Sequence, residues 1–179
     1  MGQERTPGVR RITGPDRNAG RPGEDGEIQK RLEAVGLPYN GSGTDSSRIT
    51  INKYETNELL MRNGFSVARH ALADREEWKR DPEGFYRSII QRFPFPFIAK
   101  PVDDGCSSAV KKIRNEDDLR AFSEMIFRVE EDLLAGPASV LQLKAKEEFP
   151  RKRQFLLEEL VTRKDAAHFL EITGGLMTS

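Results

Sequence analysis

The sequence contains a single cysteine, Cys106, among its 179 residues. One cysteine cannot form an internal disulfide, which excludes the class of small secreted domains framed by disulfides and fits a reducing compartment. Long hydrophobic runs are also missing, because charged or turn residues interrupt each apolar segment before the roughly 18 residues that a membrane span needs. No apolar stretch of the signal-peptide type follows the first residues. We therefore expect a cytoplasmic protein that does not bind membranes.

The chain has no excess charge of either sign, since 29 Lys and Arg residues balance 29 Asp and Glu residues. This balance argues against a nucleic-acid binder that works through bulk positive charge. The short basic run at 151–153 is then interpreted as a solvated loop, with nucleic-acid contact as the competing interpretation. The two histidines, His70 and His168, show no metal-type spacing, so we expect no zinc site.

Glycine and proline are concentrated at the start of the chain, where residues 1–26 hold six of the 15 glycines and three of the ten prolines. Few hydrophobic residues accompany them. Such a segment cannot bury enough apolar area to offset the entropy lost on ordering. We therefore expect residues 1–22 to form a flexible tail.

Apolar residues spaced three and four apart predict four helices in the remainder. The first begins near Glu27, and the second runs from about Lys53 to Arg62. A third begins at Asp81-Pro82, where a capping residue precedes proline. The longest begins after Asn115 and is expected to end at Gly136-Pro137. Its predicted apolar face contains Leu119, Phe122, Ile126, Val129 and Leu133.

Short hydrophobic segments predict a small β-sheet. Residues 97–99 are interpreted as a buried strand with 109–113 as its hairpin partner. Residues 155–157 and 168–172 are two further predicted strands, and 140–143 is a weaker candidate. Helices and strands are mixed without a long βαβ series, which indicates an α+β fold.

The first candidate site begins at Lys100, which ends the 97–99 strand and precedes a loop with Gly105, Cys106, Ser107 and Ser108. Glycine lets the backbone approach a ligand closely. Amides and hydroxyls can donate hydrogen bonds to phosphate oxygens, and an ammonium group neutralises their charge. The pattern suits a polyphosphate, but a β-hairpin turn with an exposed lysine is the alternative that spacing alone favours.

The second candidate segment is the acidic end of the 155–157 strand. Backbone groups at a strand end can contact the edge of an adenine ring, and a carboxylate can accept hydrogen bonds from ribose hydroxyls. A strand that runs into a solvated acidic turn is the simpler alternative. The residues concerned are Glu158, Glu159, Leu160, Val161 and Asp165.

The order of the motifs is more specific than any one of them. The chain reads Gly-Glu-Asp-Gly-Glu-Ile-Gln (23–29), Gly-Leu-Pro-Tyr-Asn-Gly-Ser-Gly (36–43), Asn-Lys (52–53), Ala-Lys-Pro (99–101), Gly-Cys-Ser-Ser (105–108) and Leu-Glu-Glu (157–159). This series resembles the D-alanine–D-alanine ligases of the ATP-grasp superfamily over about residues 20–172. The resemblance implies an ATP-grasp-like central subdomain of α+β class, in which an antiparallel sheet packs against helices.

The resemblance also implies a role for each matching residue. Lys53 and Lys100 are expected to bind the phosphates of ATP, and the loop from Gly105 to Ser108 is expected to cover them. Ser107, on the second serine of that loop, is the expected catalytic residue. The adenine-binding linker would be Glu158, Glu159, Leu160 and Val161, with Asp165 on the ribose.

The chain departs from the family pattern in two kinds of place. In the loop, Cys106 replaces a serine with a weaker hydrogen-bonding group, and Ala109 replaces a glycine. At the ends, the resemblance implies that residues 23–50 are a remnant of the N-terminal domain and 166–179 the start of a truncated C-terminal subdomain. The central subdomain would be 51–165, and the family fold is expected to be incomplete at both ends.

The resemblance implies a carboxylate–amine ligase that uses ATP and Mg²⁺, small-molecule nucleotide and amino-acid substrates, and an acyl-phosphate intermediate. Such a phosphoryl transfer needs metal ions to neutralise charge between the phosphates. The Mg²⁺-binding carboxylates of the family have no counterpart in this sequence. We therefore expect an ATP-binding portion that is inactive alone and that exposes apolar surface, which favours oligomers. The alternative is a non-catalytic nucleotide-binding or interaction module with the same fold.

Overall fold

The computed structural model describes residues 23–105, 109–144 and 147–162. Over this part the order of elements mixes helices and strands, as predicted for an α+β fold. The elements are α1 (Glu27–Ala34), α2 (Thr44–Ile51), α3 (Lys53–Arg62), β1 (His70–Asp74), α4 (Arg75–Arg80), α5 (Pro82–Arg92), β2 (Phe97–Pro101), β3 (Lys111–Ile113), α6 (Glu116–Phe127), α7 (Ala135–Val140) and β4 (Gln154–Glu159).

The four strands form one antiparallel sheet in the order β1-β4-β2-β3. The predicted hairpin between β2 and β3 is confirmed, with Phe97 opposite Ile113. β4 lies in the interior of the sheet although it is the last of the described strands along the sequence. It pairs with β2 so that Lys100 lies opposite Leu156, and with β1 so that His70 lies opposite Glu158.

Side chains alternate between the two faces of this sheet, as the pleat requires. On β2, Phe97 and Ala99 are fully buried, whereas Lys100 on the other face is partly exposed. On β4, Phe155 and Leu157 belong to the core. One face is therefore apolar, and the opposite face carries charged groups.

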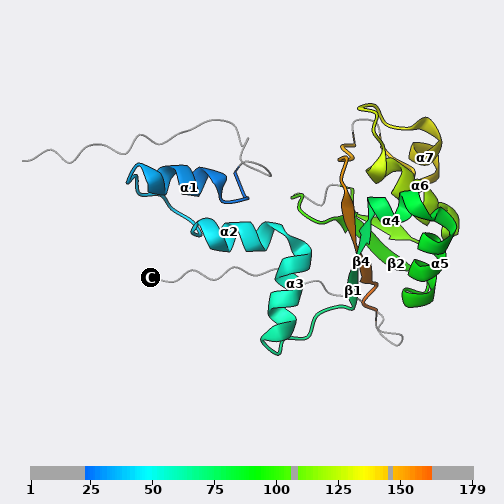
Figure 1. Cartoon of the computed structure of the whole chain (residues 1–179), viewed down its shortest axis with the longest axis horizontal. Helices are drawn as coiled ribbons and strands as arrows, with labels where there is room; N and C mark the ends of the chain where they lie inside the picture. Colours follow the sequence, from blue (N-terminus) through cyan, green and yellow to red (C-terminus); the bar gives the residue numbers. More distant parts are fainter. Residues whose placement is uncertain (1–22, 106–108, 145–146, 163–179) are drawn as a thin grey trace, which may run out of the picture.

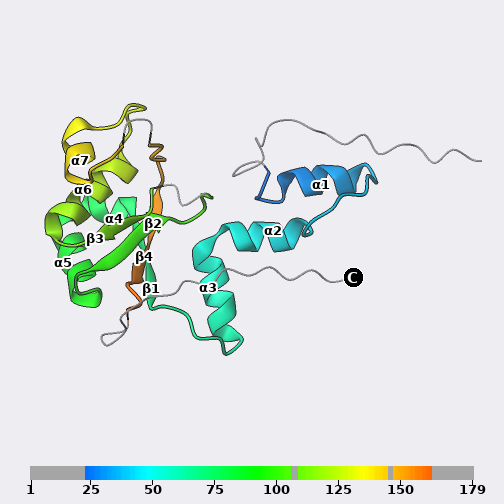
Figure 2. The ribbon, with the colours of Figure 1, turned by 180° about the vertical axis from the view of Figure 1, so that it is seen from behind.

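The apolar face packs against α5 and α6, which Figures 1 and 2 show on the same side of the sheet. The centre is an aromatic cluster around Phe155, whose ring centroid lies 5.0 Å from that of Phe122 and 5.3 Å from that of Phe127. Each buried phenylalanine contributes roughly 1.5–3 kcal/mol through the area that it removes from water. This cluster fixes the sheet and thereby the positions of the charged groups on its other face.

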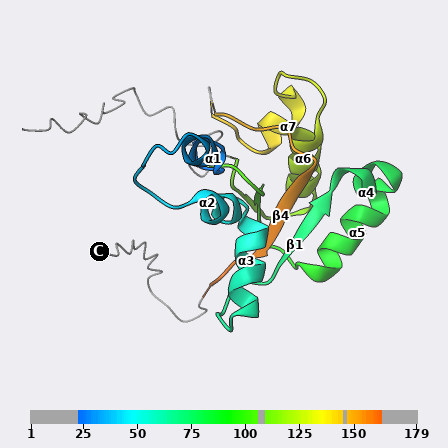
Figure 3. The same ribbon diagram turned by 60° about the vertical axis from the view of Figure 1, so that its left-hand side comes forward.

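The opposite side of the sheet faces α3, while α1 and α2 lie beyond it (Figures 1 and 3). The predicted helix over 53–62 is confirmed, with Asn52 accepting hydrogen bonds from the backbone of Tyr54 and Glu55 at 3.1 Å. In α1 and α2 only Ser47 is buried. We call these two helices and their connection, residues 27–51, the arm.

The glycine that directly precedes the arm allows a close approach of its two helices. Gly26 has a φ of +87°, a conformation that side chains disfavour. A Cβ atom added there would lie 2.5 Å from the carbonyl oxygen of Thr44, the first residue of α2. Glycine is therefore required where α1 meets α2.

The predicted extent of the longest helix is wrong. α6 ends at Phe127, and the chain turns at the buried Arg128, whose guanidinium donates to the carbonyl oxygens of Met125 at 2.6 Å and Phe149 at 2.7 Å. Val129, predicted on the apolar face, is 70% exposed. Arg128 satisfies carbonyls at the end of α6 and ties a distant segment to it, which favours the turn over a longer helix.

The predicted strand at 140–143 is also wrong, because residues up to Val140 form α7 and a turn follows. Gly136-Pro137 lies in the first turn of α7 and does not end the preceding helix. Proline is tolerated at such a position. Four of the described elements were not predicted: α2, β1, α4 and α7. The predicted strand at 168–172 and the predicted tail at 1–22 lie outside the described residues. Within the described residues, no helix combines the length and the hydropathy of a membrane span.

Candidate functional site

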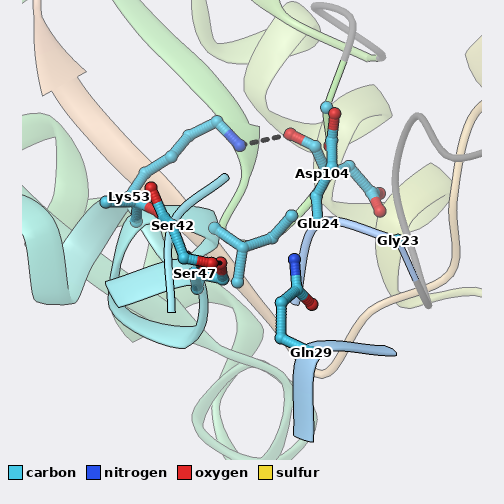
Figure 4. Close-up of a pocket in the computed structure, with 10 residues that line it drawn as sticks. Gly23, Glu24, Gln29, Ser42, Ser47, Lys53 and Asp104 are labelled. Atoms are coloured by element: carbon cyan, nitrogen blue, oxygen red, sulfur yellow. Dashed lines mark hydrogen bonds between the residues drawn. The ribbon is translucent and has the colours of Figure 1, made fainter. Parts of the chain in front are cut away.

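Lys53, the first residue of α3, is bound to the turn that follows β2. Its backbone N–H donates to the carbonyl oxygen of Val102 at 2.9 Å, and its ammonium group donates to the carbonyl oxygen of Asp104. The side chain therefore crosses from the helix to the sheet, as Figure 4 shows. A lysine in a first helical turn is usually solvated, but this one is held in place at both ends.

The electrostatic environment of Lys53 disfavours its positive charge. Burial lowers the pKa of this lysine below its ordinary value of 10.5, and the nearby positive charge of Lys100 lowers it further. Asp104 and Asp103 oppose the shift in this pKa, and Lys152 adds to it. Lys53 and Lys100 thus lie close enough to repel each other, although they come from different elements, and a site of this kind favours an anion.

Lys100 extends from the charged face of β2 toward β4. Its Nζ atom lies 2.6 Å from Oε2 of Glu158, and both side chains are less than one-fifth exposed. The other carboxylate oxygen accepts a hydrogen bond from the Asn57 amide of α3 at 3.0 Å. Glu158 therefore joins the sheet to α3 on the same side of the sheet as Lys53.

A third lysine lies at the same turn, just before β4. Lys152 Nζ is 2.8 Å from Oδ1 of Asp103 and 3.0 Å from Oδ1 of Asp104. Its side chain is 19% exposed. The interpretation of 151–153 as a solvated loop is therefore wrong for Lys152, because the strand pairing brings this residue beside the end of β2.

Next to the turn lies a pocket of about 480 Å³ between the arm and the segment that follows β2. Its lining includes Gln29 of α1, Ser42, Ser47, Lys53 and Asp104, which Figure 4 labels, and also Gly105. Lys100 and residues 158–161 do not line this pocket. The structure therefore brings Lys53 and Gly105 to one pocket and places Lys100 on the adjoining face of the sheet.

The acidic strand end divides between two sets of partners. Glu158 lies with Lys100, whereas Glu159 pairs with Arg69 and accepts a hydrogen bond from its backbone N–H at 3.2 Å. Leu160 and Val161 follow the end of β4, and Val161 is 59% exposed. The other predicted site residues lie outside the described residues: Cys106, Ser107, Ser108 and Asp165.

Carboxylate, thiolate and imidazole ligands for a metal do not gather in the described ranges 23–105, 109–144 and 147–162, where no group of three or more such residues could hold an ion. Asp103 and Asp104 are adjacent but bind Lys152. The residues that are described therefore do not fit Mg²⁺.

Comparison with known proteins identifies ligases that are similar to this chain in sequence and in structure. Residues 59–137 match the family model described as D-ala D-ala ligase C-terminus. A D-alanine–D-alanine ligase of Syntrophobacter fumaroxidans is 32% identical over 158 residues, which cover 88% of this chain and 40% of that protein. The chain is a relative of the D-alanine–D-alanine ligases.

Solved ligase structures share its fold, which is that of the ATP-grasp enzymes. The VanG D-Ala:D-Ser ligase of Enterococcus faecalis superposes with a TM-score of 0.58 at 23% identity, covering 80% of this chain and 34% of that one. A D-alanine–D-alanine ligase of Bacillus anthracis solved in complex with ATP gives a TM-score of 0.56 at 22% identity, with 80% and 38% covered. The chain thus spans less than half the length of these relatives.

Two residues beside the ligase-like motifs were not predicted as part of the site, namely Asn57 and Lys152. Asn57 lies one helical turn after Lys53 and thus on the same side of α3, a spacing that could have indicated it. Lys152 can be recognised as part of the site only when the strand pairing is known. Pro101 lies opposite Phe155, and continuation of that register brings residue 152 beside residue 104.

Proposed function

We propose that this chain carries the ATP-binding part of an ATP-dependent carboxylate–amine ligase of the D-alanine–D-alanine type. The observation that carries the proposal is the pair Lys53 and Lys100. Two partly buried ammonium groups from separate elements approach closely enough to repel each other, and the ammonium of Lys53 donates to a neutral carbonyl group. A polyphosphate would relieve this repulsion because it brings negative charge to both lysines.

Each residue would then have a defined role. Lys53 and Lys100 would bind the phosphates, with Lys100 leaving Glu158 as a phosphate oxygen takes the place of the carboxylate. Gly105 would open the loop whose members Cys106, Ser107 and Ser108 cover the phosphates, with Ser107 at the reacting group. The adenine would rest against the chain from Glu158 to Val161, and Asp165 would accept from the ribose.

The reaction of the complete site would proceed in two steps. A substrate carboxylate oxygen attacks the γ-phosphorus of ATP, the bond from that phosphorus to the bridging oxygen breaks, and ADP leaves. An amine then attacks the carbonyl carbon of the acyl phosphate, loses a proton and displaces inorganic phosphate, which leaves an amide. The lysines of this chain would hold and neutralise the phosphates. Mg²⁺, which the described residues do not fit, would be held by other groups.

We further propose that the central subdomain, 51–165, is the unit that binds nucleotide and that the chain binds it without turnover.

We also propose that the chain self-associates, because apolar side chains are exposed on α3 and just after it. Leu59, Met61 and Phe65 are 46%, 50% and 63% exposed. Sedimentation velocity measures the association directly. A monomer at all concentrations would contradict it.

Isothermal titration with ATP and Mg²⁺ tests the nucleotide site. We expect the wild-type chain to bind and Lys100→Ala to weaken binding by about tenfold or more, because a charge-assisted contact to phosphate is lost. Lys79→Ala is the matched control, since Lys79 lies on α4 with an exposed partner, Glu76. Equal binding by the wild type and Lys100→Ala would overturn the proposed phosphate role.

A second candidate function is a non-catalytic nucleotide-binding or interaction module. It is favoured by the lack of a metal-binding cluster among the described residues and by Cys106 in place of a serine. Release of inorganic phosphate from ATP in the presence of D-alanine distinguishes the two. Measurable turnover by this chain alone would exclude the module and also contradict the expected inactivity.

A further inference from the structure

The turn after β2 carries two adjacent carboxylates at the proposed phosphate site. Asp104 offers its backbone carbonyl to Lys53, so its own side chain and that of Asp103 lie in the same region. Carboxylates at such a place repel a polyphosphate, and the repulsion is large where burial reduces screening by water. Positive charge at this turn must offset the two carboxylates if the site is to accept ATP.

Lys152 is placed to do so. Its ammonium group lies 2.8 Å from Asp103 and 3.0 Å from Asp104, and its side chain is only 19% exposed. The backbone N–H of Lys152 donates to the carbonyl oxygen of Ile126 at 2.8 Å. This hydrogen bond holds the backbone of Lys152 beside the end of α6. Within the described part of the chain, Oδ2 of Asp104 is buried without a hydrogen-bond partner, and the contact of Oδ1 with Lys152 offsets the charge of this carboxylate together with the nearby charge of Lys53.

We infer that Lys152 is a positioning residue for nucleotide binding: it neutralises Asp103 and Asp104 and holds their turn so that the Asp104 carbonyl meets Lys53. The inference rests on the proposed function. Lys152 acts through the two aspartates and does not need to touch the phosphates. The charges around Lys53 agree, since both aspartates raise the pKa of Lys53 and Lys152 lowers it.

The test compares charge variants by titration with ATP and Mg²⁺. Lys152→Gln removes the positive charge that faces both carboxylates, and we expect about a tenfold loss of affinity. Lys152→Arg keeps the charge and should bind within about twofold of the wild type. Arg151→Gln is the matched control, because it removes a neighbouring positive charge that instead contacts Val129 and Glu131.

The decisive comparison uses Asp103→Asn/Asp104→Asn as background. Adding Lys152→Gln to it should change affinity by less than about twofold, because neither side chain then carries a charge to be offset. AMP should respond less than ATP to Lys152→Gln alone, since it carries fewer phosphate charges. A purely structural lysine would give neither the rescue nor the dependence on phosphate number. If Lys152→Gln alone does not fold, the effect of Lys152→Gln on affinity is measured in the Asp103→Asn/Asp104→Asn background.

Three results would overturn the inference: wild-type affinity in Lys152→Gln, a tenfold loss that persists in the Asn background, or a Lys152→Arg protein as weak as Lys152→Gln. Persistence of the loss would mean that Lys152 contacts the nucleotide directly. The proposed function fails separately, and the inference with it, if the wild-type chain does not bind ATP at all.

Discussion

Lys100 and Glu158 form an ion pair diagonally across the neighbouring strands β2 and β4, with 2.6 Å between Nζ and Oε2. Lys100 lies opposite Leu156, so Glu158 is two residues further along the same face. Diagonal neighbours of this kind come within reach of long side chains. The pair holds the lysine in place at the proposed phosphate site.

Breaking this pair from either side should destabilise the fold. Lys100→Met or Glu158→Gln is expected to lower the free energy of unfolding by about 2 kcal/mol, because a poorly exposed charge loses its partner. The double variant should lose less than the sum, with a coupling of about 1 kcal/mol. Urea denaturation measures all three. Strictly additive losses would show that the two side chains do not interact in solution.

The lowered pKa of Lys53 predicts a pH dependence of nucleotide binding. Its charged form would bind phosphate, so affinity should fall as pH rises through a pKa below 10.5. Lys53→Arg stays charged over this range and should show a flatter profile. Fluorescence or calorimetric titration of ATP between about pH 7 and pH 10 tests the difference. Identical pH profiles for the wild type and Lys53→Arg would show that Lys53 does not bind the phosphates.

The lowered pKa of Lys53 has the opposite effect on the free energy of unfolding, which should increase with pH. The folded chain binds the Lys53 proton less tightly than the unfolded chain. The contribution of this residue to stability therefore rises with pH between its lowered pKa and 10.5. Comparison of the wild type with Lys53→Met by urea denaturation across this window isolates the effect. A difference that does not change with pH would contradict it.

The aromatic cluster should dominate the stability of the sheet. Phe155 is a fully buried ring next to Phe122 and Phe127. Phe155→Ala is expected to cost about 3–5 kcal/mol, because it leaves a cavity in the core. Val129, which is 70% exposed, provides the control position. The change in the free energy of unfolding for Val129→Ala should stay within about 0.5 kcal/mol. Equal effects at the two positions, measured by urea denaturation, would be inconsistent with the described core.

The parts of the fold that could be predicted depend on contacts close in sequence. The helix over 53–62 has its own cap and stop, and the β2–β3 hairpin joins neighbouring segments. The true end of α6 could not be predicted, because it is determined by Arg128 binding the carbonyl of Phe149, far along the chain. β1 was missed since its alternation of small residues, His70 to Asp74, gives a weak strand signal.

The same division applies to the site. Lys53, Lys100 and Glu158 stand in motifs that the resemblance indicated. Lys152 stands in a basic run whose usual meaning is a solvated loop, and its meeting with Asp104 depends on which strand pairs with which. That information arises from the assembled sheet, in which β4 inserts between β1 and β2.

The arm described above also has a kinetic consequence. Helices α1 and α2 bury only Ser47, so little apolar surface opposes their opening, whereas β4 is bonded to strands on both sides and backed by the aromatic cluster. Backbone amides of residues 27–51 should therefore exchange with deuterium through frequent local fluctuations, and those of β4 only when the whole sheet comes apart. The described residues would divide into a fast population of amides in the arm and a slow population in β4.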